Sequence, residues 1–334
     1  MPKIINVAVG ILARPHGEVL LARRPAGKPY EGWWEFPGGK FEPGEDAAQA
    51  AERELEEELG IRVISSRPWL VREHVYEHAH VRLFFRRIVA WRDEPKGREG
   101  QQLAWKLVGS IDVDPLLPPS RDPLRWLGLP DIYAVSDASR CGISAWLTSF
   151  DKWLGEAGTS ASSSAEVRHM LLLREPLMDK GDFDRLFREV MARVALSGTR
   201  VLVSSRHPDE YAKEASDRTC GGVHLTAQDM YAMVQRPREE IAAWRLNHAL
   251  AAASCHREVD LQIAGRLSLD MVVCGPILPT QSHPGEATLG WEAFARMIAL
   301  TPVPVYALGG LQHYHLSRAQ DAGAHGIAMQ RSIW

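Results

Sequence analysis

Apolar residues recur every three to four positions between Asp46 and Leu59, in a stretch that is rich in Ala, Glu and Leu and contains neither Pro nor Gly. Both features predict a helix. The apolar stripe consists of Ala48, Ala51, Leu55 and Leu59. Gly60 follows directly, and glycine is the residue type that commonly ends a helix. We therefore expect one amphipathic helix from Asp46 to Leu59.

Runs of mostly apolar residues flank this helix and predict strands, because they are bounded by polar or turn residues. The strands are expected at Ile4–Leu12, Val19–Ala22, Arg67–Glu73, Val81–Trp91 and Gln102–Leu107. Mixed strands around one key helix are typical of an α/β sandwich.

From Leu129 onward, short apolar runs alternate with helix-like segments such as Phe183–Leu196 and Trp291–Leu300. The eight runs are Ile132–Val135, Met170–Arg174, Val201–Ser204, Gly222–Leu225, His248–Ala252, Met271–Cys274, Val303–Ala307 and Gly326–Met329. Such a series predicts a (β/α)8 TIM barrel. The sequence thus predicts two α/β domains, residues 1–128 and 129–334, and the Ser-rich Gly158–Glu166 is expected to be a loop inside the barrel.

The composition is ordinary for a soluble protein, with 334 residues, 45% hydrophobic and 24% charged, and a net charge of −3. No long basic run is present, so direct binding of nucleic acid is not expected. The cysteines, Cys141, Cys220, Cys255 and Cys274, include no CxxC pair, which argues against a zinc site or a disulfide framework and fits a cytoplasmic location. No apolar stretch has membrane-spanning length, so no membrane contact is expected.

Three glutamates, Glu54, Glu57 and Glu58, fall on the face of the expected helix that adjoins the apolar stripe. Like charges one turn apart weaken an isolated helix, and a bound divalent cation removes that repulsion. Carboxylate oxygens are the hard ligands that Mg²⁺ or Mn²⁺ prefers. The glycine pair Gly38-Gly39 lets a backbone carbonyl approach the same ion. The alternative is an acidic helix face that contacts only solvent.

The stretch Gly38–Ile61, GGKFEPGEDAAQAAERELEEELGI, has the spacing of the Nudix box, and about residues 3–127 resemble a Nudix hydrolase. WEFPGGK, LARRP, REGQ and a PP-containing tail make this region similar to the MutT-type members, the 8-oxo-dGTP diphosphatases. The resemblance implies Mg²⁺- or Mn²⁺-dependent hydrolysis of nucleoside triphosphates such as 8-oxo-dGTP, with a nucleoside monophosphate and pyrophosphate as products.

The resemblance also implies roles for single residues. The metal-binding and catalytic set comprises the Gly38 backbone, Arg53, Glu54, Glu57, Glu58 and Glu99. Within this set, Arg53 orients Glu54, and Glu99 of REGQ is a further ligand or the general base. Glu45 helps to fix the loop. Arg24 and Phe36 match positions that meet the nucleotide, and the alternatives are a surface charge for Arg24 and a core residue for Phe36.

The tail Pro118–Pro123 departs from the family pattern, because Arg121 replaces an Asn that reads the oxidised purine edge. An amide presents a donor and an acceptor together, whereas a guanidinium only donates. Arg can pair with the O6 and N7 acceptors of a purine, but 8-oxoguanine carries a hydrogen on N7, which opposes it. Arg121 is thus a candidate substrate-binding residue that leaves the preferred base open. A pyrophosphate of the thiamine pathway is the alternative substrate.

In the second half, IYAVSDA, GGVHLTAQD, GPILPTQSHPG, YALGGL and GAHGIAMQRSIW make residues 130–334 similar to the thiamine-phosphate synthase and thiazole tautomerase superfamily. The motifs follow expected strands, so their loops share the C-terminal face of the barrel. The resemblance implies a site for a phosphorylated, thiazole-like ligand at Arg174, Asp229, His256, Gly309, Gly310 and Arg331. His256 matches the acid/base histidine of the tautomerase, and the alternative is a surface histidine at a helix start.

Several positions of the synthase have changed. Ser205 stands in place of a metal-binding Asp, Pro176 and His283 stand in place of Lys, and Asp229 remains. One carboxylate holds Mg²⁺-pyrophosphate poorly. We therefore expect a barrel that is degenerate as a synthase. The alternatives are a module that binds a phosphate ligand or regulates the neighbouring domain, and a thiazole tautomerase.

Overall fold

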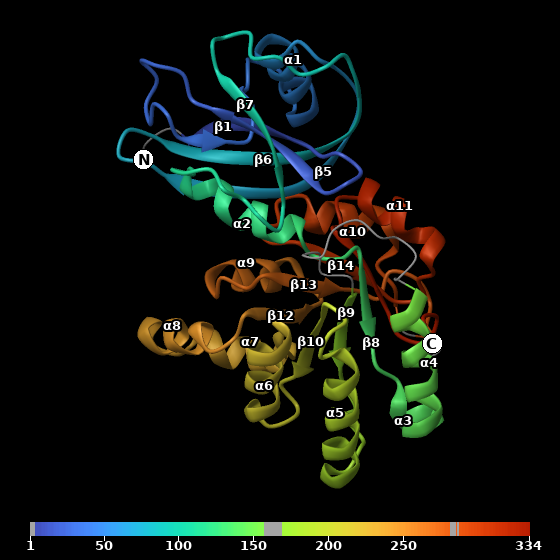
Figure 1. The fold of residues 1–334 in the computed structure, drawn as a ribbon. Helices are drawn as coiled ribbons and strands as arrows, with labels where there is room; N and C mark the ends of the chain where they lie inside the picture. The colour runs from blue at the N-terminus through green and yellow to red at the C-terminus, as the bar shows by residue number, and fades with distance from the viewer. Residues whose placement is uncertain (1–3, 157–168, 281–284, 286) are drawn as a thin grey trace. The chain divides into compact units, whose positions relative to one another are not determined.

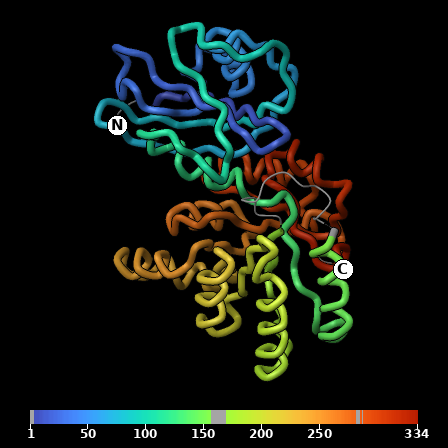
Figure 2. The backbone as a smooth tube through the Cα atoms, viewed as in Figure 1, coloured from blue at the N-terminus to red at the C-terminus, as the bar shows by residue number. Residues whose placement is uncertain are grey.

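The structure is a computed structural model that describes residues 4–156, 169–280, 285 and 287–334. It divides into two compact units, and the chain passes from the first to the second between Gly128 and Leu129 (Figures 1 and 2). The Ser-rich segment 158–166 and the changed position His283 lie outside the described residues.

The N-terminal unit contains a four-stranded and a three-stranded sheet. The larger sheet has the order β4-β1-β6-β5, with β1 Ile4–Leu12, β4 Gly38–Lys40, β5 Arg62–Val75 and β6 His80–Arg92. The smaller has the order β3-β2-β7, with β2 Glu18–Arg23, β3 Trp34–Glu35 and β7 Gln102–Leu107. Only β1 and β6 pair in parallel in these described sheets. Figure 1 shows α1 (Ala47–Leu59) on one side of the larger sheet and α2 (Pro118–Leu127) on the other, which confirms the α/β sandwich.

Helix α1 begins after Asp46 and ends before Gly60, two residue types that cap helices. The Asp46 carboxylate accepts hydrogen bonds from the N–H groups of Ala48 and Gln49, and the Gln49 side chain accepts one from the N–H of Asp46. This reciprocal cap satisfies N–H groups that a helix leaves without partners. At the other end Gly60 has a left-handed φ of 71°, and its N–H donates to the Glu56 carbonyl. Glycine takes this conformation without strain.

The buried face of α1 carries small residues in its first half and large ones in its second. Ala50 and Ala51 pack against Ala8 of β1, and all three are completely buried. Leu55 and Leu59 belong to a cluster with Leu12, Leu20, Ile61 and Ile88. Ala50 thus takes the buried place expected for Ala48, which is partly exposed. This packing leaves the glutamates of α1 beside the glycines of β4.

Strands β5 and β6 are longer than expected, and the tail forms a helix that was not predicted. Strands β5 and β6 pair from Arg62–Arg92 to Val75–His80, so both extend beyond their apolar runs, because backbone hydrogen bonds rather than side-chain pattern hold their ends. The Pro-rich tail forms α2, although prolines normally disfavour a helix. Helix α2 begins with two of its prolines in the first turn, where a missing N–H removes no hydrogen bond.

The C-terminal unit is a closed barrel of eight parallel strands, in which each strand pairs with the next and β15 pairs with β8. The strands are β8 Ile132–Val135, β9 His169–Leu173, β10 Thr199–Ser204, β11 Gly222–Leu225, β12 Leu250–Cys255, β13 Met271–Cys274, β14 Val305–Leu308 and β15 Gly326–Met329. The TIM barrel is therefore confirmed. Strand β12 begins later than expected, because His248 bonds the Trp244 carbonyl and Asp209 instead of entering the strand.

Helices surround the barrel strands, as Figure 1 shows. They are α3 Ala138–Cys141, α4 Ile143–Glu156, α5 Lys180–Val194, α6 Asp209–Thr219, α7 Ala227–Val234, α8 Arg238–Leu246, α9 Glu258–Arg266, α10 Gly290–Ile298 and α11 Leu316–Asp321, with a 3-10 turn, η2, at His313–His315. Trp146 and Phe150 of α4 stack at 5.0 Å between ring centres, and Trp334 meets both rings edge-on. The last residue of the chain thereby packs into the helix layer.

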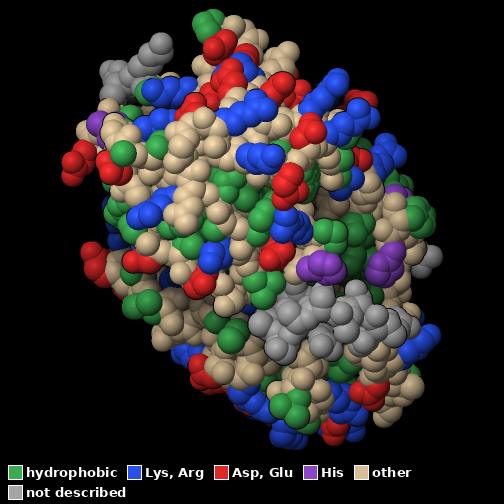
Figure 3. Space-filling view, turned by 45° about the horizontal axis from the view of Figure 1, so that its top comes forward, with side chains coloured by type: hydrophobic (Ala, Val, Ile, Leu, Met, Phe, Trp, Pro, Cys, Tyr) green, Lys and Arg blue, Asp and Glu red, His purple; other side chains and the backbone are tan. Residues whose placement is uncertain are grey.

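The surface carries charges of both signs. On the face drawn in Figure 3, Lys and Arg side chains are interspersed with Asp and Glu. Within the part of the chain that the structure describes, no helix has the length and hydropathy needed to cross a membrane.

Leu55 tests the packing of α1. Its side chain is completely buried and fills space left by Gly10, where an added Cβ would lie 2.7 Å from Leu55 Cδ1. Leu55→Ala should lower the free energy of unfolding of the N-terminal unit by about 3 kcal/mol. Chemical denaturation of the full chain, followed by far-UV circular dichroism, measures this change. Glu56→Ala, on the exposed face of α1, is the control and should change it by less than about 0.5 kcal/mol. Equal effects of the two changes would contradict the packing.

Candidate functional site

Arg53 is the centre of a hydrogen-bond network on the acidic face of α1. Its guanidinium donates to the two oxygens of Glu45 at 2.7 and 3.0 Å, to Glu54 at 3.0 Å, to Glu57 at 3.2 Å and to the Lys40 carbonyl at 2.9 Å. The bonds from Arg53 lower the pKa of Glu45 to about 2. A planar group with five donors can serve all of these acceptors at once. Arg53 thus ties the loop before α1 to the helix and orients Glu54.

Glu58 lies where negative charge is poorly compensated. Its carboxylate accepts the N–H of Gly38 at 3.1 Å. Burial nevertheless raises the pKa of Glu58 to about 7, and the neighbouring carboxylates of Glu35, Glu54 and Glu99 act in the same direction. The surroundings of Glu58 therefore disfavour its charged form, mainly through burial and then through the neighbouring negative charges.

The glycines of β4 make this closeness sterically feasible. A Cβ on Gly38, whose φ is 144°, would lie 2.1 Å from the carbonyl oxygen of Ala8. A Cβ on Gly39 would lie 2.2 Å from the carboxylate of Glu54. A side chain at either position would displace β1 or Glu54, so the pair lets the β4 backbone and the α1 carboxylates approach one another.

Glu99 joins the same region from the loop before β7. It forms a salt bridge with Lys28, on the loop between β2 and β3, with 2.7 Å between Nζ and Oε2. The hydrogen bond to Glu99 raises the pKa of Lys28. The charge of Glu99 also contributes to the raised pKa values of Glu54 and Glu58, although burial is the larger cause for both. The three carboxylates therefore lie within electrostatic range of one another.

This set of donors fits a divalent cation in its chemistry. Glu54, Glu57, Glu58 and Glu99 supply only oxygen ligands, which suit Mg²⁺ or Mn²⁺. Among the described residues, no three His, Cys, Asp or Glu side chains already form a ligand group. Instead, Arg53 forms ion pairs with Glu54 and Glu57, and Lys28 forms one with Glu99. A dication at these carboxylates would compete with both cations.

The residues expected to meet the nucleotide lie on two elements. Arg24, after β2, pairs with Glu35 at 2.5 Å and donates to the Pro29 carbonyl at 2.6 Å. Phe36 is buried, with 3% of its surface exposed, and meets Phe85 edge-on. Arg24 and Phe36 therefore each contact other residues of the protein, with or without a role in binding a nucleotide.

Arg121 lies apart from these two residues in sequence and is exposed on α2. The start of α2 is tied to β3, because the N–H of Leu117 donates to the Trp34 carbonyl at 2.9 Å. Arg121 is therefore carried by a helix whose position is fixed against the strand that precedes Phe36.

In the barrel, Asp229 is bonded by the protein's own hydroxyl groups. Its Oδ2 accepts hydrogen bonds from Ser205, after β10, and from Thr226, each at 2.6 Å. The Ser205 hydroxyl also accepts the N–H of Thr226 at 3.0 Å. Ser205, which stands in place of a carboxylate of the synthase, thus contacts Asp229, the carboxylate that remains.

Two arginines follow neighbouring strands at the same end of the barrel. Burial, and then the charge of Arg206, lowers the pKa of Arg174. Next to them, Glu175 is 2% exposed and accepts the N–H groups of Ala138 and Ser139, each at 2.8 Å. Glu175 therefore fixes the start of α3, while the two arginines leave positive charge at the strand ends.

His256 follows β12 and is exposed, with its Nδ1 3.0 Å from the Gly275 carbonyl. Because a carbonyl only accepts, Nδ1 carries the hydrogen, and in the neutral ring Nε2 is the acceptor. His224, by contrast, is buried inside the barrel between the Tyr133 and Ser254 hydroxyls, and burial lowers its pKa to about 3.

The remaining predicted barrel residues follow β14 and β15. A Cβ on Gly309 would lie 2.6 Å from Pro276, and one on Gly310 would lie 2.5 Å from the Pro279 carbonyl oxygen, so packing alone requires glycine at both positions. Arg331 is exposed in the turn after β15. Because all eight strands are parallel, these residues share the C-terminal end of the barrel with Arg174, Asp229 and His256.

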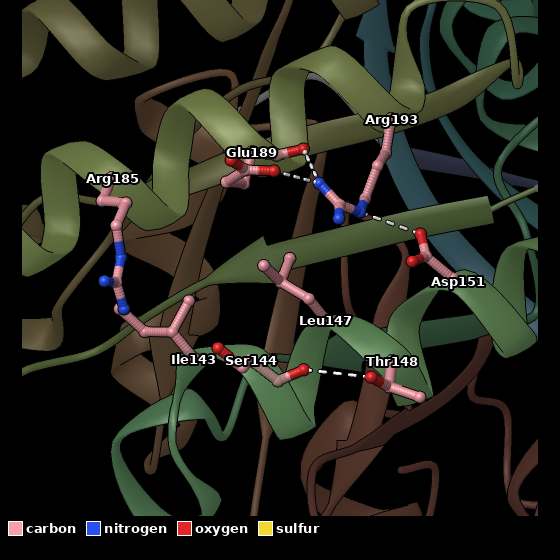
Figure 4. Close-up of a pocket in the computed structure, with 8 residues that line it drawn as sticks. All are labelled: Ile143, Ser144, Leu147, Thr148, Asp151, Arg185, Glu189 and Arg193. Atoms are coloured by element: carbon pink, nitrogen blue, oxygen red, sulfur yellow. Dashed lines mark hydrogen bonds and ion pairs between the residues drawn. The ribbon is translucent and has the colours of Figure 1, made fainter.

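A cavity of about 340 Å³ lies elsewhere, between α4 and α5 (Figure 4). It is lined by Ile143, Ser144, Leu147, Thr148, Asp151, Arg185, Glu189 and Arg193. Arg193 donates to Asp151 at 2.9 Å and to Glu189 at 2.5 Å, so these charges are paired within the cavity. None of the predicted site residues lines it.

Comparison with known proteins identifies both units. The sequence profile of the NUDIX domain matches residues 3–127. The 8-oxo-dGTP diphosphatase of Escherichia coli (strain K12) is 35% identical over 122 residues, which are 36% of this chain and 94% of that protein. The profile of the family described as thiamine monophosphate synthase matches residues 149–333, more than half of the chain. The chain belongs to both families. Its Nudix domain is that of a hydrolase acting on diphosphate bonds.

Two further relatives each resemble part of the chain. A thiamine-phosphate synthase-like protein of Aquifex aeolicus (strain VF5) is 27% identical over 201 residues, which are 60% of this chain and 95% of that protein. The CTP pyrophosphohydrolase of Escherichia coli (strain K12) is 54% identical over 59 residues, which are 18% of this chain and 43% of that protein. The first match spans nearly the whole of its relative, whereas the second spans less than half of its relative.

Three charged residues close to these sites were not predicted from the sequence. Glu35 stands between the apolar Trp34 and Phe36, and Glu175 follows the apolar end of β9 and Arg174. An acidic residue in or beside an apolar run signals a buried carboxylate with specific partners, so both could have been found. Lys28 lies in a polar loop of the Nudix domain and carries no such signal.

Arg53 tests how the Nudix domain holds its carboxylates. Arg53→Lys keeps the charge but cannot bond Glu45, Glu54 and the Lys40 carbonyl together. We expect Mn²⁺ affinity, measured by titration calorimetry, to fall roughly 10- to 100-fold, as for other residues that orient metal ligands. Arg62→Lys, an exposed position on β5, is the control. A variant Arg53→Lys with unchanged Mn²⁺ affinity would show that the network does not orient the ligands.

Proposed function

We propose that the Nudix domain is an Mg²⁺- or Mn²⁺-dependent pyrophosphohydrolase of nucleoside triphosphates, oxidised ones such as 8-oxo-dGTP included. The observation that carries this proposal is the group of carboxylates on α1. Arg53 bonds Glu54 and Glu57, Glu58 accepts the N–H of Gly38, and the charge of Glu99 acts on Glu58. The similarity to an 8-oxo-dGTP diphosphatase over 94% of that protein supports the substrate class. The products are a nucleoside monophosphate and pyrophosphate.

Each residue of the site has a part in this reaction. Glu54, Glu57, Glu58 and the Gly38 carbonyl would hold the dication, which would supply charge neutralisation for the phosphates and a lower pKa for bound water. Arg53 keeps Glu54 and Glu57 oriented through its own bonds to Glu45. Glu99 is a further ligand or the general base, and as the base it accepts the proton of the attacking water on a carboxylate oxygen. The water oxygen forms a bond to one phosphorus of the bridge between the first and second phosphate groups. The P–O bond from that phosphorus to the bridging oxygen breaks, and the bridging oxygen leaves with the other product.

Arg121 bears on which base is preferred. It is exposed on α2, where its guanidinium can donate to the O6 and N7 acceptors of an unmodified purine. The hydrogen on N7 of 8-oxoguanine opposes such a donor. A weak preference between 8-oxo-dGTP and dGTP is therefore expected. The CTP pyrophosphohydrolase likeness makes a pyrimidine triphosphate a further substrate to compare.

A substrate panel on the full chain tests the metal assignment. Glu57→Gln should lower kcat by about 100-fold or more on every substrate, because the variant loses a negatively charged ligand. The panel comprises 8-oxo-dGTP, dGTP, CTP and thiamine pyrophosphate, each with Mg²⁺ and with Mn²⁺. Glu56→Gln, one position away and exposed, is the control. Full activity in Glu57→Gln would exclude the metal role, and a strong preference for thiamine pyrophosphate would favour the alternative substrate.

We propose further that the barrel binds a phosphorylated small molecule and does not act as a thiamine-phosphate synthase. Arg174 and Arg206 supply positive charge for such a ligand, whereas Asp229 is bonded by Ser205 and Thr226. A carboxylate with two hydroxyl donors on one oxygen is less available to a metal ion.

The full chain should therefore form no thiamine phosphate from the two substrates of the synthase, assayed by chromatography of the products. Formation of thiamine phosphate would contradict the proposal. Thiazole tautomerase activity that is lost in His256→Ala, but kept in His313→Ala, would instead identify the barrel as an enzyme of that second class.

A further inference from the structure

Lys28 is the second cation among the carboxylates of the Nudix site. Its Nζ lies 2.7 Å from Glu99, and the two side chains are 48% and 44% exposed. Glu58 also acts on Lys28 electrostatically, as does Arg24 with the opposite sign. Lys28 therefore lies among a proposed catalytic carboxylate, a proposed metal ligand and an arginine expected to meet the nucleotide.

The loop that carries Lys28 is closed at its base. The N–H of Arg24 donates to the Trp33 carbonyl at 2.9 Å, and the N–H of Gly32 donates to the Arg24 carbonyl at 3.0 Å. Near the tip, the N–H of Gly27 donates to Glu31 at 3.0 Å. The backbone at Lys28 is thus held in place, while its flexible side chain can move the ammonium group.

Lys28 and Arg53 differ in how easily they can release a carboxylate. Arg53 bonds four acceptor groups at once, Glu45 through two oxygens, and the loss of one contact leaves the others. In the part of the chain that the structure describes, Glu99 is the side-chain partner of Lys28. If Glu99 leaves Lys28, the ammonium group can bind another negatively charged group.

We propose that Lys28 is an exchange cation: it neutralises Glu99 before the site is loaded, releases Glu99 when a dication binds, and then binds the polyphosphate of the substrate. This inference rests on the proposed function of the Nudix domain. A dication that attracts Glu99 leaves the ammonium without its partner, and the polyphosphate supplies negative oxygens at the same place. Lys28 is a positioning and substrate-binding residue in this scheme, and it takes no proton.

The scheme predicts two effects of opposite sign. Without the ammonium, Glu99 has no competing partner, so a dication should bind more tightly in the absence of nucleotide. The same change removes a contact with the substrate, so KM should rise while kcat changes little. A lysine that only supports the fold would weaken both kinds of binding.

The experiment uses the full chain as Lys28→Met and Lys28→Arg. Lys28→Met should raise Mn²⁺ affinity without nucleotide by roughly threefold or more, and should raise KM for dGTP about tenfold with kcat within about twofold of the wild type. Lys28→Arg should restore both values. The control is Lys106→Met, because Lys106 forms a similar salt bridge with Asp112, also at 2.7 Å, and neither residue belongs to the site.

Three results would overturn the inference. Lys28→Met could match Lys106→Met in both measurements, it could bind Mn²⁺ more weakly than the wild type, or it could lose kcat with KM unchanged. Circular dichroism checks that each variant folds, and Lys28→Gln replaces Lys28→Met if the latter does not. A wild-type protein that hydrolyses no triphosphate counts against the proposed function instead, and the Mn²⁺ titration still reports on Lys28.

Discussion

Repulsion between carboxylates on a half-buried helix face is the constraint on which the Nudix domain depends. Burial raises the pKa of Glu54 and Glu58, and neighbouring acids add to the effect. Such a group of charges is stable only beside cations. Arg53 and Lys28 supply them within the chain, so the fold tolerates its acidic face before any ion or substrate arrives. The net binding free energy of a dication at this face would be its attraction to the carboxylates minus the attraction of Arg53 and Lys28 that it replaces.

The barrel uses its buried and half-buried acids differently. Glu175 holds the start of α3, and Asp229 receives the hydroxyls of Ser205 and Thr226. Each carboxylate has hydrogen-bond donors from the protein, which lowers its need for an external cation. The two domains therefore differ in the charges that they bring together: acids on α1 in the first, and Arg174 and Arg206 after neighbouring strands in the second.

The features that the sequence predicts well are those set by neighbouring residues. The cap at Asp46, the apolar stripe of α1 and the left-handed Gly60 follow from residue type and helical spacing, as do the glutamates on the same helix. The alternating runs of the barrel are equally local. Strand β12 begins late because His248 binds Asp209, a residue 39 positions earlier.

The contacts that cannot be predicted from the sequence are clearest at the two candidate sites. The salt bridge between Lys28 and Glu99 joins residues 71 positions apart, and the contact of Ser205 with Asp229 joins residues 24 apart. Neither pairing follows from a periodic pattern, since each depends on which loops the fold brings together. The residues that share one face of a helix can be predicted from the sequence, whereas the partner of each charged side chain depends on the three-dimensional fold.

The small residues behind α1 have a consequence for how the site could vary. Ala50 and Ala51 rest on Ala8 with no exposed surface, so the distance from the helix axis to β1 is set by methyl groups. A larger side chain at either position would lift the helix away from the sheet and carry its carboxylates away from β4. The spacing between the α1 carboxylates and β4, where we propose that a dication binds, is thus determined on the opposite, apolar side of the helix.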